Sequence, residues 1–545
     1  MHTHKHNVFT ILLTILLTIL LAILLGIGAA GCSNNQTGDK DDLQKKIEQL
    51  EKDLAAKDAE LAGKNDQLTE KDDQLAEKDG EIAEKDNQLA EKDSQLTEKD
   101  NQLAEKDKTI EDLERQLEFA NTYDFYLTLG TMPTLYATLN AYTVQNPNTY
   151  MWFYRGNTIS KEYSAPFIHY FSTQSDTNAN STIDYMEIRN TVRKIKQSNP
   201  NAKFRLWCDD LRVRFIPDIF VAAGVNFEDM KVTLLSDGTA TYSYYKNAAF
   251  TAEYYASQAA KWTEILTTYK ENAATDPNYT MYDDQNGQAM ELAYFAYYVS
   301  SFDNVEYWIQ HPDYLKNDAL AEAKKSMHLV KKNPKDIYLA LDETTRKSYQ
   351  EVVLANALVG SDTLHTLKDA AEYFDAQLSG RDKEVVLILG TRYNGLESNQ
   401  DFIDQTIAYY TPVRSADDAT KVTFKNKVYE VAADAKTVTV EGKDYRIGEV
   451  SVYLFFKGHP SYPANEQLQA YFAENNIVVL PHRTPVETLF WMYNVKAGGY
   501  QSTSFLSCTE GQTEFFYGQP DTEALVQMME DGFFDGAVIF TKTAK

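Results

Sequence analysis

Apolar residues recur at every seventh position through a long polar segment that covers residues 41–118. They are Leu54, Leu61, Leu68, Leu75, Ile82, Leu89, Leu96, Leu103, Ile110 and Leu117. The repeat is close to Leu-Ala-Glu-Lys-Asp-x-Gln, which favours a helix supported by Glu–Lys pairs. A coiled coil needs a second apolar position in each heptad, and that position is Lys or Asp in most repeats. We therefore predict a helical stalk of about 115 Å that acts as a spacer and self-associates weakly at most.

A different pattern begins near residue 119, where short apolar runs alternate with segments of helical periodicity. Such alternation is typical of parallel βαβ units. Strands are expected at residues 125–129, 151–154, 204–207 and 384–390, a helix at 183–197, a mostly helical stretch at 247–380 and a β-hairpin insertion at 421–448.

The break in this pattern at Ser379-Gly380-Arg381-Asp382 divides the globular part into two domains. We predict an α/β fold in which two Rossmann-like domains, residues 119–380 and residues 381–545, face a cleft. The length of 545 residues agrees with more than one domain, because a single hydrophobic core stops growing well below that size.

The N-terminus has the pattern of a targeting segment, assigned to residues 1–32. Residues 8–27 are apolar apart from three threonines, and the small residues 28–31 precede Cys32. This arrangement resembles the lipobox of bacterial lipoproteins, which implies lipidation at Cys32, and residues 33–40 then form a linker. The alternative is an uncleaved transmembrane anchor, since about 20 apolar residues span a bilayer. Either interpretation places the rest of the chain outside the cytoplasm, tethered to a membrane.

The charge balance argues against one class of partner. The net charge is −27, whereas nucleic-acid binding requires a basic surface. Close to half of the excess lies in the stalk, where residues 41–118 carry 26 Asp and Glu against 13 Lys and Arg. Three cysteines do not form a disulfide framework, and the pairing of Cys208 with Cys508 cannot be judged from the sequence.

The first candidate for chemistry follows the apolar run that ends in Phe455-Phe456. Lys457, Gly458 and His459 come directly after it, at the carboxyl end of an expected strand, where open α/β sheets bind ligands. A protonated His beside a Lys can offset the charge of a phosphate. A structural role for His459 is equally open.

Two further motifs follow within the same domain. Thr484-Pro485-Val486-Glu487 has the signals of a helix start, and local sequence favours a Glu487 that simply caps its own helix. The alternative is that Glu487 points into the cleft and binds ribose hydroxyls. Gly498-Gly499-Tyr500-Gln501-Ser502-Thr503-Ser504 offers close backbone approach and hydroxyls for phosphate oxygens, although as a generic loop it is unremarkable.

The other domain contributes a carboxylate at Ser236-Asp237-Gly238. Asp237 either belongs to a β-turn or takes a proton from an incoming hydroxyl group at the end of a strand. Asp209-Asp210 is a competing pair of carboxylates, but Arg205, Arg212 and Arg214 surround it in the sequence. We therefore expect that pair to form a salt-bridged surface turn.

Taken in order, these motifs resemble the bacterial sialyltransferases of glycosyltransferase family 80. That family carries an Asp-Asp-Gly motif, a Lys-Gly-His-Pro motif, a Ser-x-Glu helix start and a Gly-Gly-x-x-Ser-Ser turn. The resemblance covers roughly residues 122–530, and it implies a GT-B fold and an inverting transfer from CMP-sialic acid to a terminal galactoside without a metal or other cofactor.

The resemblance also implies a role for each matching residue. Asp237 matches the general base, and His459 matches the residue that stabilises the departing CMP. The donor-binding residues are Lys457, Thr484, Glu487, Ser502 and Thr503, and Tyr393 matches a Trp that stacks on the acceptor.

Some residues depart from the family pattern. Ser236 replaces the first Asp of the pair, and Pro485 replaces a donor-site Ser, so that Thr484 is the expected source of the hydroxyl. These changes leave the donor sugar open, and another CMP-linked ulosonic acid is an alternative. A glycan-binding lipoprotein on a transferase scaffold is the second hypothesis, because CMP-sugars are made in the cytoplasm and this domain is expected outside it. A structural envelope protein is the third.

Overall fold

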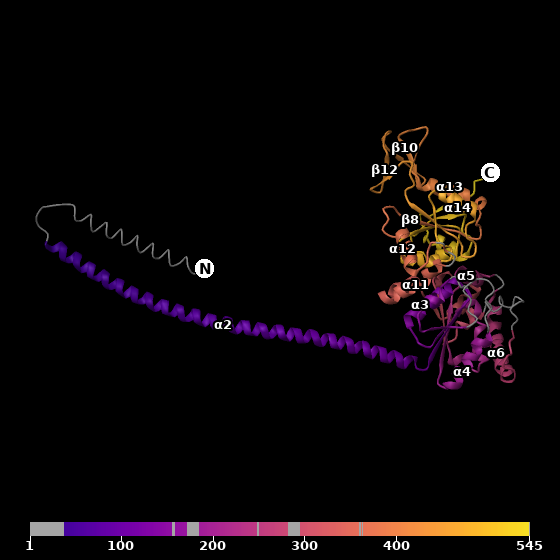
Figure 1. The fold of residues 1–545 in the computed structure, drawn as a ribbon, viewed down its shortest axis with the longest axis horizontal. Helices are drawn as coiled ribbons and strands as arrows, with labels where there is room; N and C mark the ends of the chain where they lie inside the picture. The colour runs from indigo at the N-terminus through magenta and orange to yellow at the C-terminus, as the bar shows by residue number, and fades with distance from the viewer. Residues whose placement is uncertain are drawn as a thin grey trace. The chain divides into compact units, whose positions relative to one another are not determined.

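The computed structural model describes residues 37–154, 158–171, 185–247, 250–281, 295–358, 361 and 363–543. Helix α2 spans Thr37–Phe119, which confirms the long helix predicted from the heptad pattern (Figure 1). No helix in these described ranges is long and apolar enough to cross a membrane. The apolar segment at residues 8–27 and Cys32 lie outside the described residues.

The chain divides into two compact units, residues 1–111 and residues 112–545. The second unit contains two parallel sheets, and the predicted pair of Rossmann-like domains is confirmed by them. Within the described residues, the first sheet has seven strands in the order β3-β2-β1-β4-β5-β6-β7. Its strands are β1 (Thr122–Thr128), β2 (Thr149–Phe153), β3 (Ile168–Tyr170), β4 (Lys203–Asp209), β5 (Lys231–Leu235), β6 (Val305–Ile309) and β7 (Leu329–Lys331).

Helices cover both faces of this first sheet, as the parallel connections require (Figure 1). The helices of this half of the chain are α3 (Thr131–Val144), α4 (Tyr185–Ser198), α5 (Thr239–Lys246), α6 (Ala252–Thr275), α8 (Phe295–Val299), α9 (Ala321–Lys324), α10 (Pro334–Ala340), α11 (Glu343–Leu354) and α12 (Leu367–Leu378), and α11 and α12 lie between the two sheets (Figure 1). The described part of the stretch 247–380 is mostly helical, as expected, and it also contributes the short strands β6 and β7.

The second sheet has six parallel strands in the described residues, in the order β15-β14-β8-β16-β17-β18. All five residues of β8 are buried, which agrees with a central strand covered on both faces. The strands are β8 (Val385–Leu389), β14 (Tyr453–Lys457), β15 (Val478–Val479), β16 (Lys496–Gly499), β17 (Thr513–Tyr517) and β18 (Val538–Phe540), and the helices are α13 (Leu396–Tyr410), α14 (Glu466–Glu474), α15 (Val486–Met492) and α16 (Glu523–Glu530).

The insertion between α13 and β14 is more elaborate than the single hairpin expected. Strands β10 (Lys421–Phe424) and β11 (Lys427–Glu430) form one hairpin, with β9 (Val413–Arg414) at its edge. Strands β12 (Thr437–Val440) and β13 (Lys443–Arg446) form a second hairpin. The insertion lies on the side of the second sheet that is remote from the first sheet (Figure 1).

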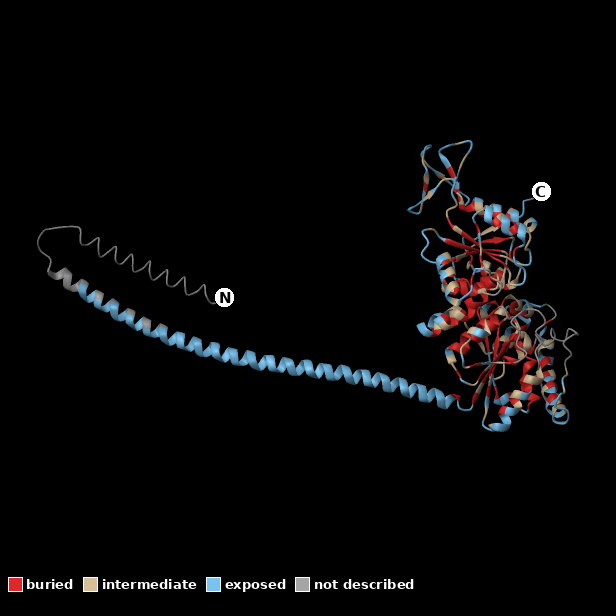
Figure 2. Ribbon diagram, in the orientation of Figure 1, coloured by how far each residue is buried: buried red, intermediate tan, exposed pale blue. Residues whose placement is uncertain are grey.

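The two halves of the globular unit share one hydrophobic cluster. It includes Phe125 of the first sheet and Phe516 of the second, together with helix residues between them such as Phe374. Figure 2 shows buried residues running through both sheets and the helices between them. An ion pair between Lys246 and Glu523, at 2.7 Å, adds a polar contact between the halves. The apolar interface holds the carboxyl edges of the two sheets in place.

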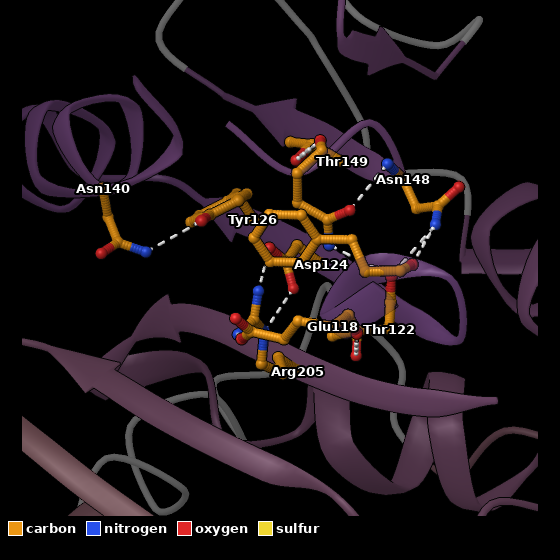
Figure 3. A network of polar contacts seen from close by, with 10 residues as sticks. Glu118, Thr122, Asp124, Tyr126, Asn140, Asn148, Thr149 and Arg205 are labelled. Carbon is orange, nitrogen blue, oxygen red and sulfur yellow. Dashed lines mark hydrogen bonds and ion pairs between the residues drawn. The ribbon is translucent and has the colours of Figure 1, made fainter. Parts of the chain in front are cut away.

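A polar network fills the amino-terminal end of the first sheet (Figure 3). Arg205 donates two hydrogen bonds to Asp124, at 2.6 and 2.7 Å, and these residues are register partners on β4 and β1. Asn140 donates to the hydroxyl of Tyr126 at 2.8 Å. Arg205 therefore pairs with Asp124 rather than with the acidic residues at the other end of β4.

Candidate active site

A cavity of about 300 Å³ lies where the carboxyl edges of the two sheets meet. Residues from both halves line it, as expected for a ligand site in a two-domain α/β protein. The first half contributes Thr131, Met132, Thr158, Asp237, Thr239 and Ala240, and the second contributes Leu389, Gly390, Lys457, Gly458, His459, Pro460, Pro485, Val486, Glu487, Ser502, Thr503 and Ser504.

Asp237 lies between β5 and α5, on the wall formed by the first half. Its backbone N–H donates to the hydroxyl of Thr241 at 3.0 Å, which ties the residue to the first turns of α5. A Cβ atom built on Gly130 would stand 2.1 Å from Oδ1 of Asp237. The carboxylate therefore lies against the backbone of Gly130, and only glycine leaves it that position.

Asp209 ends β4 and Asp210 follows it, both close enough to Asp237 to feel its charge, and they correct one expectation. Both are fully buried rather than part of a salt-bridged surface turn. Asp209 accepts hydrogen bonds from the backbone N–H groups of Leu129 and Gly130, and Asp210 accepts them from Thr241 and Tyr307. Burial raises the pKa of each carboxyl group to about 7, and the charge of Asp237 adds to the effect.

Lys457 ends β14 on the opposite wall and is buried. Its ammonium group donates to the carbonyl oxygens of Gly458 and His482, at 2.8 and 2.7 Å. Burial lowers the pKa of Lys457 to about 8, an effect that the Glu487 carboxylate partly offsets. At neutral pH the cavity thus contains a desolvated cation, which attracts an anion more strongly than an exposed lysine would.

His459 follows on the same wall, beside Tyr462 with the ring centroids 5.1 Å apart. Its Nδ1 atom accepts a hydrogen bond from the backbone N–H of Ser461 at 3.1 Å. A neutral imidazole held in this way carries its proton on Nε2, so it is a hydrogen-bond donor through that atom. This geometry suits a residue that donates to a developing oxyanion.

The structure contradicts the expectation that Glu487 caps its own helix. Helix α15 begins at Val486, with Pro485 at the N-cap position and no side-chain cap. The carboxylate of Glu487 instead accepts a hydrogen bond from the hydroxyl of Ser504 at 2.6 Å. Glu487 therefore belongs to the cavity wall and is held there by the loop that follows β16.

Ser502 and Thr503 bring that loop to the first half of the molecule. Ser502 Oγ lies 3.1 Å from Ser504 Oγ, and Thr503 Oγ1 lies 3.2 Å from Thr239 Oγ1 across the cavity. A Cβ atom on Gly238 would stand 1.9 Å from the Thr503 methyl group. The two halves are in van der Waals contact at this point, within two residues of Asp237.

Two predicted residues do not join the cavity. Thr484 is fully buried beneath the wall, and its hydroxyl has no hydrogen-bond partner among the described residues. Tyr393 is 45% exposed and packs against Tyr500 with ring centroids 5.6 Å apart. Tyr393 follows β8 on the same edge of the sheet, but it does not line the cavity.

Three residues with evident parts in the site were not among the predicted site residues. Ser504 orients Glu487, and Asp209 holds the turn beneath Asp237. Thr158 lines the cavity with a buried hydroxyl that has no partner among the described residues. Ser504 stood in the quoted glycine-rich motif, whereas nothing local marks Thr158.

Neither metal ligands nor a disulfide are evident in the part of the chain that the structure describes. No group of three or more His, Cys, Asp or Glu residues there is arranged to hold a metal ion. Cys208 and Cys508 are both buried free thiols, which answers the question of their pairing. The expectation of a metal-independent reaction stays a prediction.

Comparisons with known proteins bear on the fold. No family model and no curated protein matches the sequence. Among solved structures, an α/β-galactoside α-2,3-sialyltransferase from Photobacterium phosphoreum superposes with a TM-score of 0.52 at 14% identity, over 77% of this chain and 98% of the other. The globular part of the chain has the fold of bacterial sialyltransferases.

A second structure agrees with this assignment. The sialyltransferase from Photobacterium damsela superposes with a TM-score of 0.50 at 16% identity, over 77% of this chain and 81% of the other. The GT-B architecture predicted from the motifs is thus confirmed. At these identities the likeness establishes the sialyltransferase fold, and the chemistry has to be argued from the cavity.

Proposed function

We propose that this protein is an inverting glycosyltransferase that moves sialic acid from CMP-sialic acid to a hydroxyl group of a terminal galactoside. One observation carries the proposal. A carboxylate, Asp237, lies on one wall of the cavity, and two hydrogen-bond donors suited to a phosphate, Lys457 and His459, lie on the other.

This division matches the charges that develop in the reaction. The acceptor oxygen attacks the anomeric carbon of the sugar, the bond from that carbon to the phosphate oxygen breaks, and CMP leaves with the electron pair. The proton of the acceptor hydroxyl passes to Asp237, acting as general base. Because the attacking and leaving groups occupy opposite walls, a single in-line displacement with inversion follows.

The second half of the molecule supplies the donor side. Lys457 and the Nε2 proton of His459 stabilise the negative charge on the departing phosphate in a partly desolvated site. Glu487, oriented by Ser504, accepts hydrogen bonds from the ribose hydroxyls. Ser502 and Thr503 donate to phosphate oxygens, and Thr484, whose hydroxyl does not reach the cavity, is withdrawn as a contact.

The acceptor side of the cavity is assigned from its position beside Asp237. Thr131, Met132 and Thr158 lie on the wall with Asp237, where an acceptor sugar would bind. Tyr393 reaches the acceptor only if its exposed ring turns toward the cavity. A lipid anchor at Cys32 and a location outside the cytoplasm remain part of this proposal.

The experiment is turnover by purified residues 112–545, a range that retains the buried ring of Phe119. CMP-N-acetylneuraminic acid and a lactoside are supplied, and CMP release and product mass are followed. We expect a sialylated product, and a loss of about 10²–10⁴-fold in rate for Asp237→Asn because the general base is removed. Asp276→Asn, an exposed residue of the same half, is the matched control and keeps full activity.

Other outcomes point to the alternatives. Product only from another CMP-linked ulosonic acid would change the donor and keep the chemistry. A folded protein that binds the lactoside without turnover of any donor would favour the glycan-binding lipoprotein. Equal activity of Asp237→Asn and wild type would contradict the assigned base.

A further inference from the structure

Asp209 is a buried carboxylate beneath the cavity that the proposed reaction does not use. It is the last residue of β4 and is 1% exposed. Its Oδ2 atom accepts from the N–H of Leu129 at 2.7 Å, and its Oδ1 atom accepts from the N–H of Gly130 at 2.8 Å. These two bonds fix the turn between β1 and α3.

That turn forms the floor under Asp237. Gly130 precedes the first turn of α3, and its carbonyl oxygen accepts from the hydroxyl of Thr134 at 2.7 Å. The 2.1 Å approach of Asp237 Oδ1 to a Cβ position on Gly130 means that the carboxylate rests on this backbone. Movement of the turn would therefore move the carboxylate of Asp237, together with the adjacent Thr131 that lines the cavity.

We propose that Asp209 is a positioning residue for Asp237, since it clamps the Leu129–Gly130 turn on which that carboxylate lies. The proposal deepens the transferase function and rests on it. Asp209 itself contacts neither the cavity nor a reacting atom.

The electrostatics agree with the geometry. Burial, and then the neighbouring charge of Asp237, raise the pKa of Asp209 to about 7, and the two N–H groups and Arg212 oppose this. Below pH 7 Asp209 is therefore mostly protonated, and its two oxygen atoms still accept hydrogen bonds from the two N–H groups. Arg212 also acts on Asp209, and Tyr242 of α5 and Tyr307 of β6 act on Asp210, which itself senses the charge of Asp237. Lys457, His459 and Glu487 line the cavity wall across from Asp237.

The substitution Asp209→Asn weakens the clamp while it keeps the size of the buried side chain. An amide offers one acceptor oxygen in place of two, so one of the two N–H groups loses its partner and the turn shifts. A shift of about 1 Å in a reacting group costs about 10²-fold in kcat. Because Asp209 is mostly protonated below pH 7, its replacement by Asn should leave the acid limb of the kcat/KM profile in place, and the loss should appear in kcat.

The test compares full-length wild type, Asp209→Asn and the control Asp218→Asn. Asp218 is an equally buried carboxylate of the first half, bonded to Tyr269 and Thr280 outside the cavity. We expect Asp209→Asn to lose kcat while its affinity for CMP stays within about twofold. Asp218→Asn should lose stability only. Identical kinetic behaviour of the two variants would overturn the proposal.

A second readout does not depend on turnover. The Cγ signal of Asp237 is observed by NMR in the full chain labelled with ¹³C at the aspartate Cγ atoms, and Asp237→Asn identifies the signal. We expect its chemical shift at constant pH to move in Asp209→Asn and to stay in place in Asp218→Asn, because the turn under the Asp237 carboxylate has shifted. An unmoved signal in Asp209→Asn would refute the proposal even if the wild-type chain proved inactive, so failure of the proposed function and failure of this inference are distinguishable.

Discussion

Gly238→Ala should damage the cavity more than any ordinary loop substitution, because it acts at the contact between the two halves. Gly238 has φ +65° and ψ −135°, a region that is essentially restricted to glycine. An alanine there costs about 1–3 kcal/mol in backbone strain alone. Its Cβ atom would also stand 1.9 Å from the methyl carbon of Thr503.

The clash between a Cβ atom on Gly238 and the Thr503 methyl group predicts the size of the loss in kcat. Carbon atoms in contact lie about 3.5 Å apart, so the two residues must separate by about 1.5 Å. A displacement of that order between Asp237 and the donor wall should lower kcat by about 10²-fold or more. Thr503→Ser removes the clashing methyl group and keeps the hydroxyl, and the nearest remaining Thr503 atoms lie at 3.0 Å.

The assay is a double-mutant cycle of Gly238→Ala and Thr503→Ser, with sialyl transfer and melting temperature as readouts. Gly380→Ala is the matched control, since Gly380 has φ +63° but no atom within 4 Å of a Cβ position. It should lose a few degrees of stability and no activity. We expect Thr503→Ser to restore part of the activity of Gly238→Ala. Equal effects of Gly238→Ala and Gly380→Ala, or no restoration by Thr503→Ser, would refute the reasoning.

Two further predictions concern pH. Because burial lowers the pKa of Lys457 to about 8, the affinity for CMP measured by calorimetry should fall between pH 7 and pH 9.5. Lys457→Met should bind CMP weakly and without this pH dependence. A wild-type affinity that stays constant over this range would contradict the assignment. Because burial raises the pKa of Asp210 from 3.8 to about 7, the folded state binds more protons than the unfolded chain, and the free energy of unfolding should fall by up to about 4 kcal/mol from pH 4 to pH 8. Chemical denaturation should show a flatter dependence for Asp210→Asn, and parallel curves would disprove it.

Much of the fold could be predicted because its patterns are local. The heptad repeat predicted α2, and continuous apolar runs such as Val385–Leu389 predicted central parallel strands. Strand β6 was missed because it carries a glutamate, Glu306, within a tyrosine-rich stretch. Its place in the sheet comes from pairing with β5, which no local pattern reports.

The acidic residues after β4 show where sequence neighbours mislead. Arg205 is close to Asp209 in the chain, but it lies at the other end of the strand and pairs with its register partner Asp124. Asp209 and Asp210 are left to bind N–H and hydroxyl groups of the β1–α3 turn, α5 and β6. Strand order, which the sequence does not state, decides the partners.

The residues of the candidate site likewise divide into those that a local pattern predicts and those whose partners only the fold determines. Asp237, Lys457 and His459 were predicted from their position after apolar strands, and the sheets bring them to one cavity. Glu487 was expected to cap its helix from the local sequence alone. Its partner in the structure, Ser504, was missed because it lies in a loop 17 residues further on. Thr484 and Tyr393 were carried over by motif matching, and neither side chain lines the cavity.

The central claim is that this cavity binds a CMP-activated sugar with the phosphate on the Lys457–His459 wall. A crystal structure of residues 112–545 with CMP tests it most directly. The account predicts the phosphate within hydrogen-bond distance of His459 Nε2 and the loop at Ser502, with the ribose hydroxyls at Glu487. CMP bound away from these residues, or an empty cavity at saturating CMP, would contradict it.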